Sequence, residues 1–360
     1  AAVRQCGSAA VRQCGSAAVR QRSSAAVQGL GGQRAVGSGA RRRAATKHGT
    51  LAGVMSPLPP AISSLADLAA VAAAARVRHT PCGGTGALVW HAWGDASDAG
   101  RPVLLLHGGA GSWTHWVRNI AALRRAGRSV WVPDLPGFGA SALPPGCLDA
   151  DQLPPWLGQG LQRLLGERAL DVVGFSFGGL VGGYLAQSQP ARVASLMLVG
   201  APALGAERRA PLPLRRWSSV PAGARRDAIH RHNLRTLMLA HEDAADALAI
   251  AIHGANVERD RMRRRRLMLT DALRRMLPGI ACPLAGIWGE RDVLYLGREP
   301  IVAEALRLAP HFRRLSWVPG AGHWVVYEDA AAFDALLGAW LDEVAPPGTD
   351  AARHPDERMR

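Results

Sequence analysis

The hydrophobic pattern of this 360-residue chain alternates between two kinds of segment from residue 76 onward. Apolar runs of about four to eight residues, typical of buried strands, are separated by longer segments with helical spacing. The segments that predict strands are 76–80, 87–94, 102–108, 130–135, 169–176, 193–202, 284–292 and 312–323. Helices are expected over roughly 115–126, 151–167, 178–189, 299–309 and 328–344. This order predicts an α/β fold with a mostly parallel sheet and helices on both faces.

One region interrupts the alternation. Residues 206–278 contain no strand-like run and are expected to form several helices between the strands predicted at 193–202 and 284–292. Active residues of such sheets collect at the carboxyl ends of the strands, and we expect the insertion to form a helical cap over those ends. The expected domains are therefore a core made of 55–205 and 279–346, and this cap.

The two ends of the chain differ from the rest. Residues 1–54 begin with AAVRQCGS twice and then AAVRQRSS, and they contain eight Arg, one Lys and no acid. A period of eight is too short for a solenoid repeat, and no apolar periodicity is present to build a core. We expect this segment to be disordered or not native, with Met55 near the true start; an Arg-rich transit peptide is the alternative. A disordered tail is expected over 347–360.

Charge and cysteine content narrow the class of protein. The net charge is +15, and the nine cations of 1–54 supply more than half of it. No apolar stretch reaches the length of about 18 residues that a membrane span needs. Outside the repeats, Cys82, Cys147 and Cys282 are scattered without C-x-x-C spacing. Their scattered positions argue against a disulfide framework or a zinc site, and a cytoplasmic location is expected.

A serine stands where the chain passes from a predicted strand to a predicted helix. Ser176 lies between Gly174 and Gly178 in the pattern G-x-S-x-G. A sharp strand-to-helix turn presents such a serine and needs small neighbours, while the following helix directs backbone N–H groups at the site. Ser176 is therefore the candidate nucleophile, and a small polar residue in a tight turn is the alternative.

A serine nucleophile needs a base, and the base needs a group that orients it. His323 follows a predicted strand and a Gly-rich loop, and Asp292 stands just beyond another predicted strand. Taken singly, a loop histidine and a turn aspartate are common. The order Ser176, Asp292, His323, each after its own strand, is the chain order of an α/β-hydrolase triad.

An acyl-transfer site also needs donors for the developing oxyanion. The sequence LLLHGGAGSW at 104–113 is a Gly-rich turn after a central predicted strand. The backbone N–H groups of Gly109 and Phe177 are the expected donors. A dinucleotide site is disfavoured because the glycines lack G-x-G-x-x-G spacing.

Taken together, these motifs resemble the α/β-hydrolase-fold superfamily. The resemblance covers about 76–345 through LHGGAGSW, VPDLPGFGAS, VGFSFGG, GERD and GAGHW. It implies the triad and a structural rather than catalytic Asp134. The Trp after His323 and the pattern HGG…W…RNI are similar to carbon–carbon bond hydrolases that cleave ring-fission products, the 2-hydroxy-6-oxo-dienoates.

The second resemblance implies an anionic substrate with an Arg beneath the cap, for which Arg259 and Arg261 are the candidates. Two departures oppose it: the oxyanion loop lacks Gly-Pro-Gly, and Phe175 and Phe177 flank the serine where that family has Asn and often Met. They favour a drier pocket and an ester or similar substrate. The remaining candidate substrate contacts are Gly108, Trp113, Phe175 and Trp324.

The sequence thus predicts a serine hydrolase for a small, largely apolar carbonyl substrate, acting by ester or carbon–carbon bond hydrolysis. Neither a metal nor an organic cofactor is required, no nucleic-acid or membrane partner is expected, and a homodimer remains open. The alternatives are a catalytically inactive scaffold and a polyanion-binding protein that uses the Arg-rich cap. A solvated surface is the simplest interpretation of the run Arg263–Arg266.

Overall fold

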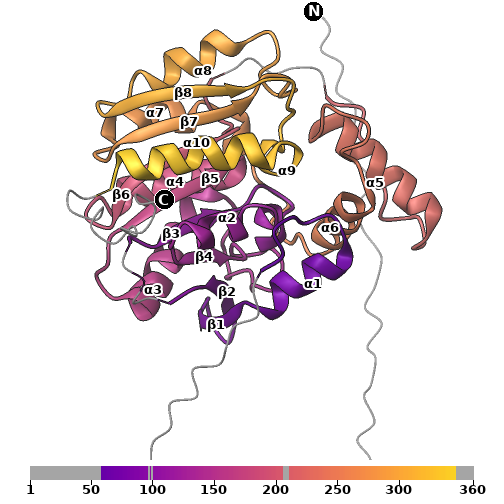
Figure 1. Ribbon diagram of the computed structural model, residues 1–360, viewed down its shortest axis with the longest axis horizontal. Coiled ribbons are helices and arrows are strands. Elements are labelled where there is room, and N and C mark those ends of the chain that lie inside the picture. Colours follow the sequence, from indigo (N-terminus) through magenta and orange to yellow (C-terminus); the bar gives the residue numbers. More distant parts are fainter. Residues whose placement is uncertain (1–57, 96–97, 99, 206–210, 346–360) are drawn as a thin grey trace, which may run out of the picture. The chain divides into compact units, whose positions relative to one another are not determined.

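The computed structural model describes residues 58–95, 98, 100–205 and 211–345, which contain one eight-stranded sheet (Figure 1). The strands are β1 Arg76–Pro81, β2 Ala87–Trp93, β3 Val103–Leu106, β4 Val130–Pro133, β5 Leu170–Phe175, β6 Val193–Val199, β7 Leu284–Gly289 and β8 Phe312–Val318. Their order is β1-β2-β4-β3-β5-β6-β7-β8. β2 is antiparallel to both of its neighbours, and every other pair is parallel. The predicted α/β fold with a mostly parallel sheet is confirmed.

Helices cover both faces of the sheet because side chains alternate along the central strands. Val103 and Leu105 of β3 belong to the core beneath α1, α2 and α10, whereas Leu104 and Leu106 belong to the core beneath α3, α4 and α8. The bounds of the core helices are α1 Leu65–Ala73, α2 Ile120–Arg125, α3 Pro154–Leu165, α4 Phe177–Ser188, α8 Glu299–Leu306, α9 Val325–Glu328 and α10 Ala330–Glu343, with 3-10 turns at Trp113–Trp116 (η1) and Ala150–Gln152 (η2).

Helix α1 was not assigned from the sequence, although its amino end has a clear signal. Ser64 accepts from the N–H of Asp67, and the Asp67 carboxylate accepts from the N–H of Ser64. This reciprocal capping box satisfies backbone groups that the first turn leaves without partners. The alanine-rich stretch that follows has high helix propensity and no strand-like alternation.

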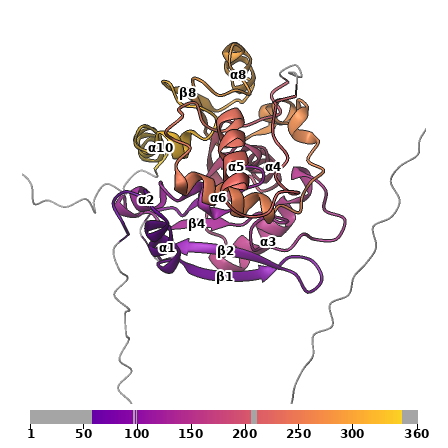
Figure 2. The same cartoon turned by 90° about the vertical axis from the view of Figure 1, so that its right-hand side faces the viewer.

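The insertion between β6 and β7 is helical, as expected. It contains α5 Ala224–Leu237, α6 Ala247–Glu258, η3 Leu267–Leu269, α7 Ala272–Met276 and η4 Leu277–Gly279. In Figure 1, α5 and α6 lie to one side of the sheet, and Figure 2 shows them in front of the strands. α7 instead packs against α4 of the core. We call residues 211–278 the cap segment.

The repeats of 1–54 and the tail of 347–360 lie outside the described residues. Within the described ranges, no helix is long and apolar enough to cross a bilayer. Cys82, Cys147 and Cys282 are buried and unpaired, and burial raises the pKa of each thiol to about 11.

Candidate active site

The chain turns sharply at Ser176, between β5 and α4. The φ of Ser176 is 51°, in the left-handed region that non-glycine residues rarely adopt. Its N–H donates to the Val199 carbonyl of β6 at 2.7 Å. A Cβ at Gly174 would lie 2.4 Å from the Gly178 oxygen, and one at Gly178 would lie 2.2 Å from the Leu106 oxygen. Any larger residue than glycine would clash at positions 174 and 178, which accounts for the G-x-S-x-G pattern.

Three strand ends bring the predicted triad residues together. His323 Nε2 lies 2.9 Å from Ser176 Oγ, and His323 Nδ1 lies 2.8 Å from Asp292 Oδ2. The other carboxylate oxygen of Asp292 accepts from the Leu294 N–H at 2.9 Å. A carboxylate only accepts, so Nδ1 carries the proton and Nε2 is left to accept from the serine hydroxyl. Ser176, His323 and Asp292 are 6%, 3% and 1% exposed.

Glycines at the ends of β6 and β7 make room for this arrangement. Gly200 follows β6 with a φ of +52°, and a Cβ there would lie 3.2 Å from His323 Nδ1 and 3.3 Å from Asp292 Oδ2. Gly289 ends β7, and a Cβ there would lie 2.1 Å from the Gly322 oxygen. Neither glycine was singled out in the sequence, although both stand at the ends of apolar runs.

The predicted oxyanion donors follow two adjacent parallel strands, β3 and β5. Gly109 lies in the loop after β3. Phe177 is the first residue of α4, and its N–H has no acceptor within the helix. The neighbouring Gly108 uses its own N–H to bond His115 Nδ1 at 3.3 Å, and a Cβ at Gly108 would lie 3.0 Å from the Phe175 ring.

The two phenylalanines beside Ser176 are fully buried packing residues. The Phe175 ring lies 5.6 Å from the ring of His115 and 5.1 Å from that of His323, measured between centroids. The Phe177 ring lies 5.7 Å from Phe138. Apolar side chains therefore flank Ser176 in the chain, and one of them, Phe175, packs against the His323 ring.

One arginine of the cap segment lies against the loop after β3 that carries Gly109. The Arg265 guanidinium lies within 3.7 Å of the point where a Cβ of Gly109 would stand, and 5.8 Å from the Phe177 ring centroid. Both carboxylate oxygens of Asp260 accept from its Nη1 at 2.8 Å. The Arg265 side chain is 17% exposed. Of the run Arg263–Arg266, the other three members are exposed, as expected for a solvated surface.

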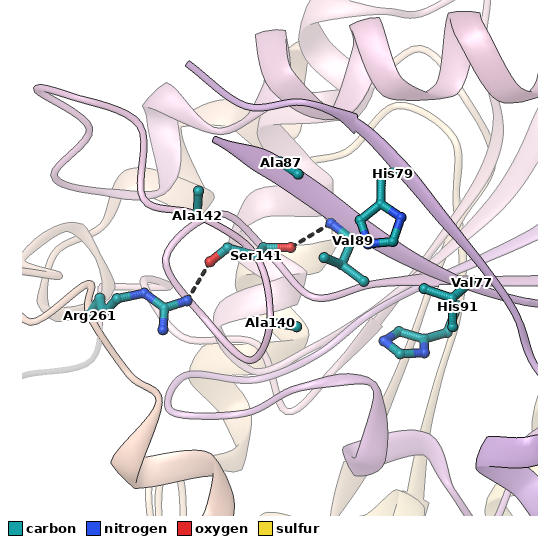
Figure 3. Close-up of a pocket in the computed structure, with 9 residues that line it drawn as sticks. All are labelled: Val77, His79, Ala87, Val89, His91, Ala140, Ser141, Ala142 and Arg261. Atoms are coloured by element: carbon teal, nitrogen blue, oxygen red, sulfur yellow. Dashed lines mark hydrogen bonds between the residues drawn. The ribbon is translucent and has the colours of Figure 1, made fainter. Parts of the chain in front are cut away.

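The two arginines predicted to contact substrate lie elsewhere. Arg261 Nη2 donates to the carbonyl of Gly139 at 3.1 Å and to that of Ser141. Figure 3 shows Arg261 at the edge of a hollow beside β1 and β2 that His79 also lines. Arg259 follows α6 and is exposed. Among the described contacts, neither arginine bonds a residue of the predicted triad.

Two tryptophans predicted as substrate contacts are core residues. Trp113 is 9% exposed, and its ring lies 5.4 Å from that of Trp93. Trp324 is 1% exposed and stacks on Tyr327 at 4.2 Å. Its Nε1 donates to the His115 carbonyl at 3.2 Å. Both tryptophans therefore have the simpler role of packing in the core.

Polar residues of α6 that the sequence analysis did not single out face the region after β3. Asn256 of α6 is 4% exposed; it accepts from Ser112 Oγ at 2.7 Å and donates to Thr114 Oγ1 at 3.1 Å. His253 lies one turn earlier on α6, and burial lowers its pKa to about 4. Polarity is the signal that the sequence offers, because both residues interrupt the mostly apolar helix ALAIAIHGANVE.

Known proteins share this fold and part of this sequence. A profile of the alpha/beta hydrolase fold family matches residues 101–250. A pimeloyl-acyl-carrier-protein methyl ester esterase of Aeromonas salmonicida is 32% identical over 199 residues, which are 54% of this chain and 69% of the relative. A 2-hydroxy-6-oxononadienedioate/2-hydroxy-6-oxononatrienedioate hydrolase of a Pseudomonas species is 25% identical over 266 residues, 68% of this chain and 88% of the relative.

Solved structures agree on the architecture. A thermophilic esterase from Thermogutta terrifontis superposes with a TM-score of 0.59 at 22% identity, covering 75% of this chain and 100% of that chain. A meta-cleavage product hydrolase superposes with a TM-score of 0.58 at 21% identity, covering 74% and 98%. The eight-stranded sheet, the serine elbow and these relatives show that the chain belongs to the α/β-hydrolase-fold family and is a hydrolase.

Proposed function

We propose that this chain is a serine hydrolase with Ser176 as nucleophile, His323 as general base and acid, and Asp292 as the group that orients the imidazole. The observation that carries the proposal is the unbroken hydrogen-bonded line from Asp292 through His323 to Ser176, at 2.8 and 2.9 Å. The backbone of Ser176 has a left-handed conformation that is stabilised by the surrounding packing. Strained backbone conformations of this kind are common at functional sites.

The reaction follows from this geometry. His323 Nε2 accepts the proton of Ser176 while Oγ attacks the substrate carbonyl carbon, and Asp292 stabilises the imidazolium. The carbonyl oxygen becomes an oxyanion that accepts from the N–H groups of Gly109 and Phe177. As the intermediate collapses, the leaving group takes the proton from His323. Water, deprotonated by His323, then releases the acid and restores the serine.

We infer that the substrate is a small, largely apolar ester. Phe175 and Phe177 are apolar on both sides of the serine, and the Aeromonas salmonicida relative is named as an esterase. Carbon–carbon bond hydrolysis is the second candidate, because the Pseudomonas relative is named as a dienedioate hydrolase and Arg265 places a cation beside Gly109. Both reactions use the same serine and oxyanion donors.

A fluorophosphonate probe and a short p-nitrophenyl ester test the proposal directly. The native chain should be labelled on Ser176 and should hydrolyse the ester, whereas Ser176→Ala should lose both and keep its unfolding temperature. Ser218→Ala, an exposed serine of the cap segment, is the matched control and should keep both. An unlabelled native chain would instead indicate a catalytically inactive scaffold. Assaying a ring-fission dienoate alongside the ester then separates the two substrate classes.

A further inference from the structure

Two buried histidines flank the loop that carries Gly109. His107 Nδ1 donates to the Gly108 carbonyl at 2.8 Å, while its Nε2 accepts from the Leu135 N–H at 2.9 Å. Both bonds require the neutral ring with its proton on Nδ1. In a trans peptide the carbonyl and the following N–H point in opposite directions. Bonding the Gly108 carbonyl therefore fixes the direction of the Gly109 N–H.

The preceding peptide is fixed by the second histidine. The Gly108 N–H donates to His115 Nδ1 at 3.3 Å. The His115 ring is 3% exposed and lies directly against the loop, since a Cβ at Gly111 would stand 2.4 Å from its Cε1 and 2.5 Å from its Nδ1. The His115 ring can therefore pack against the loop only because residue 111 is a glycine.

His115 also connects the loop to the segment of the predicted base. Its carbonyl accepts from Trp324 Nε1 at 3.2 Å, and Trp324 directly follows His323. Its ring lies 5.0 Å from the Trp324 ring and 5.6 Å from that of Phe175, which precedes Ser176. One buried side chain thus touches all three parts of the site: the oxyanion loop, the serine turn and the histidine loop.

We propose that His115 is a positioning residue that aligns the oxyanion loop, by accepting the Gly108 N–H with a neutral imidazole. This inference rests on the proposed serine hydrolase function, because it assigns no chemistry to His115 itself. Only unprotonated Nδ1 can accept from an N–H. Burial, reinforced by the nearby rings of His107, His253 and His323, keeps the pKa of His115 well below its usual range.

Two amide side chains separate this role from simple packing. Asparagine presents its oxygen where the imidazole has Nδ1, whereas glutamine places its amide near the position of Nε2. His115→Asn should therefore keep the acceptor for Gly108, and His115→Gln should lose it, although both bury a neutral amide. We expect His115→Gln to lower kcat for the ester about 10- to 100-fold with little change in KM, and His115→Asn to stay within a few-fold of the native chain.

The rate of Ser176 phosphonylation by a fluorophosphonate is the second readout, because the phosphoryl oxygen also accepts from the oxyanion donors and no knowledge of the substrate is needed. The labelling rate should fall with kcat in His115→Gln and recover in His115→Asn. Equal labelling by both variants at the native rate, or equal loss in both with unchanged unfolding temperatures, would overturn the role of His115. A native chain that is never labelled would overturn the serine hydrolase proposal instead, so the two failures are distinguishable.

Discussion

Two regions contain candidate functional residues: the strand ends of the core, and the loop 259–266 that follows α6 in the cap segment. The position of these residues is determined differently in each region. At the strand ends, Ser176, Asp292 and His323 each follow a parallel strand of one sheet, so the topology delivers them to one edge. In the loop 259–266, contacts distant in sequence decide which side chain turns inward. Residues at strand ends can therefore be located from the sequence pattern, whereas the contacts of the cap segment depend on the tertiary structure.

Loss of the Asp292 carboxylate should reduce activity more than any other change considered for the strand ends. Asp292→Asn keeps the size of the side chain but removes the carboxylate that accepts from His323 Nδ1–H, so the imidazole favours the wrong tautomer. We expect kcat for the ester to fall about 10⁴-fold with an unchanged fold. Steady-state kinetics and circular dichroism measure the two quantities.

Asp271→Asn is the matched control within the cap segment. Asp271 forms an exposed ion pair with Arg275, and exposed pairs contribute little. Its activity should equal that of the native chain. If Asp271→Asn lost activity while Asp292→Asn kept it, the strand-end assignment of the acid would be wrong.

The same contrast explains how much could be predicted from the sequence. The strands and Ser176 were predictable because apolar runs and G-x-S-x-G are local patterns whose geometry a sheet enforces. Arg265 was not, because nothing within the run of arginines distinguishes its members. Asp149, more than a hundred residues earlier, accepts from the N–H groups of Arg266 and Leu267 at 2.6 and 3.0 Å, and Asp260 pairs with Arg265. Those contacts fix the loop.

An intermediate effect tests whether the cap segment contributes to substrate choice. Arg265 lies beside Gly109, so a substrate carboxylate near Gly109 would pair with its guanidinium. Arg265→Gln should lower kcat/KM for a dienoate about 10- to 100-fold and for a neutral ester by only a few-fold, as the loss of a charge-assisted hydrogen bond implies.

Arg263→Gln is the control for net charge, since Arg263 is exposed in the same run. It should leave both substrates unaffected. Equal losses on the neutral and anionic substrates in Arg265→Gln would indicate that the arginine supports the loop through Asp260 and does not select substrates. Kinetics at two salt concentrations would expose any contribution from long-range attraction.

The smallest effect concerns how acid acts on the cap segment. Burial lowers the pKa of His253 to about 4, below the value near 6.5 of an unfolded chain. The folded state therefore disfavours the charged ring. The contribution of His253 to the free energy of unfolding is complete above pH 6.5. It declines as the pH falls from 6.5 toward 4, by at most about 1.4 kcal/mol per pH unit. The variant His253→Phe cannot take up this proton. As the pH is lowered, the free energy of unfolding of the variant should therefore fall less steeply than that of the native chain. Urea titrations followed by tryptophan fluorescence at pH 7, 6 and 5 would measure both slopes, and identical slopes would show that His253 does not link the cap to pH.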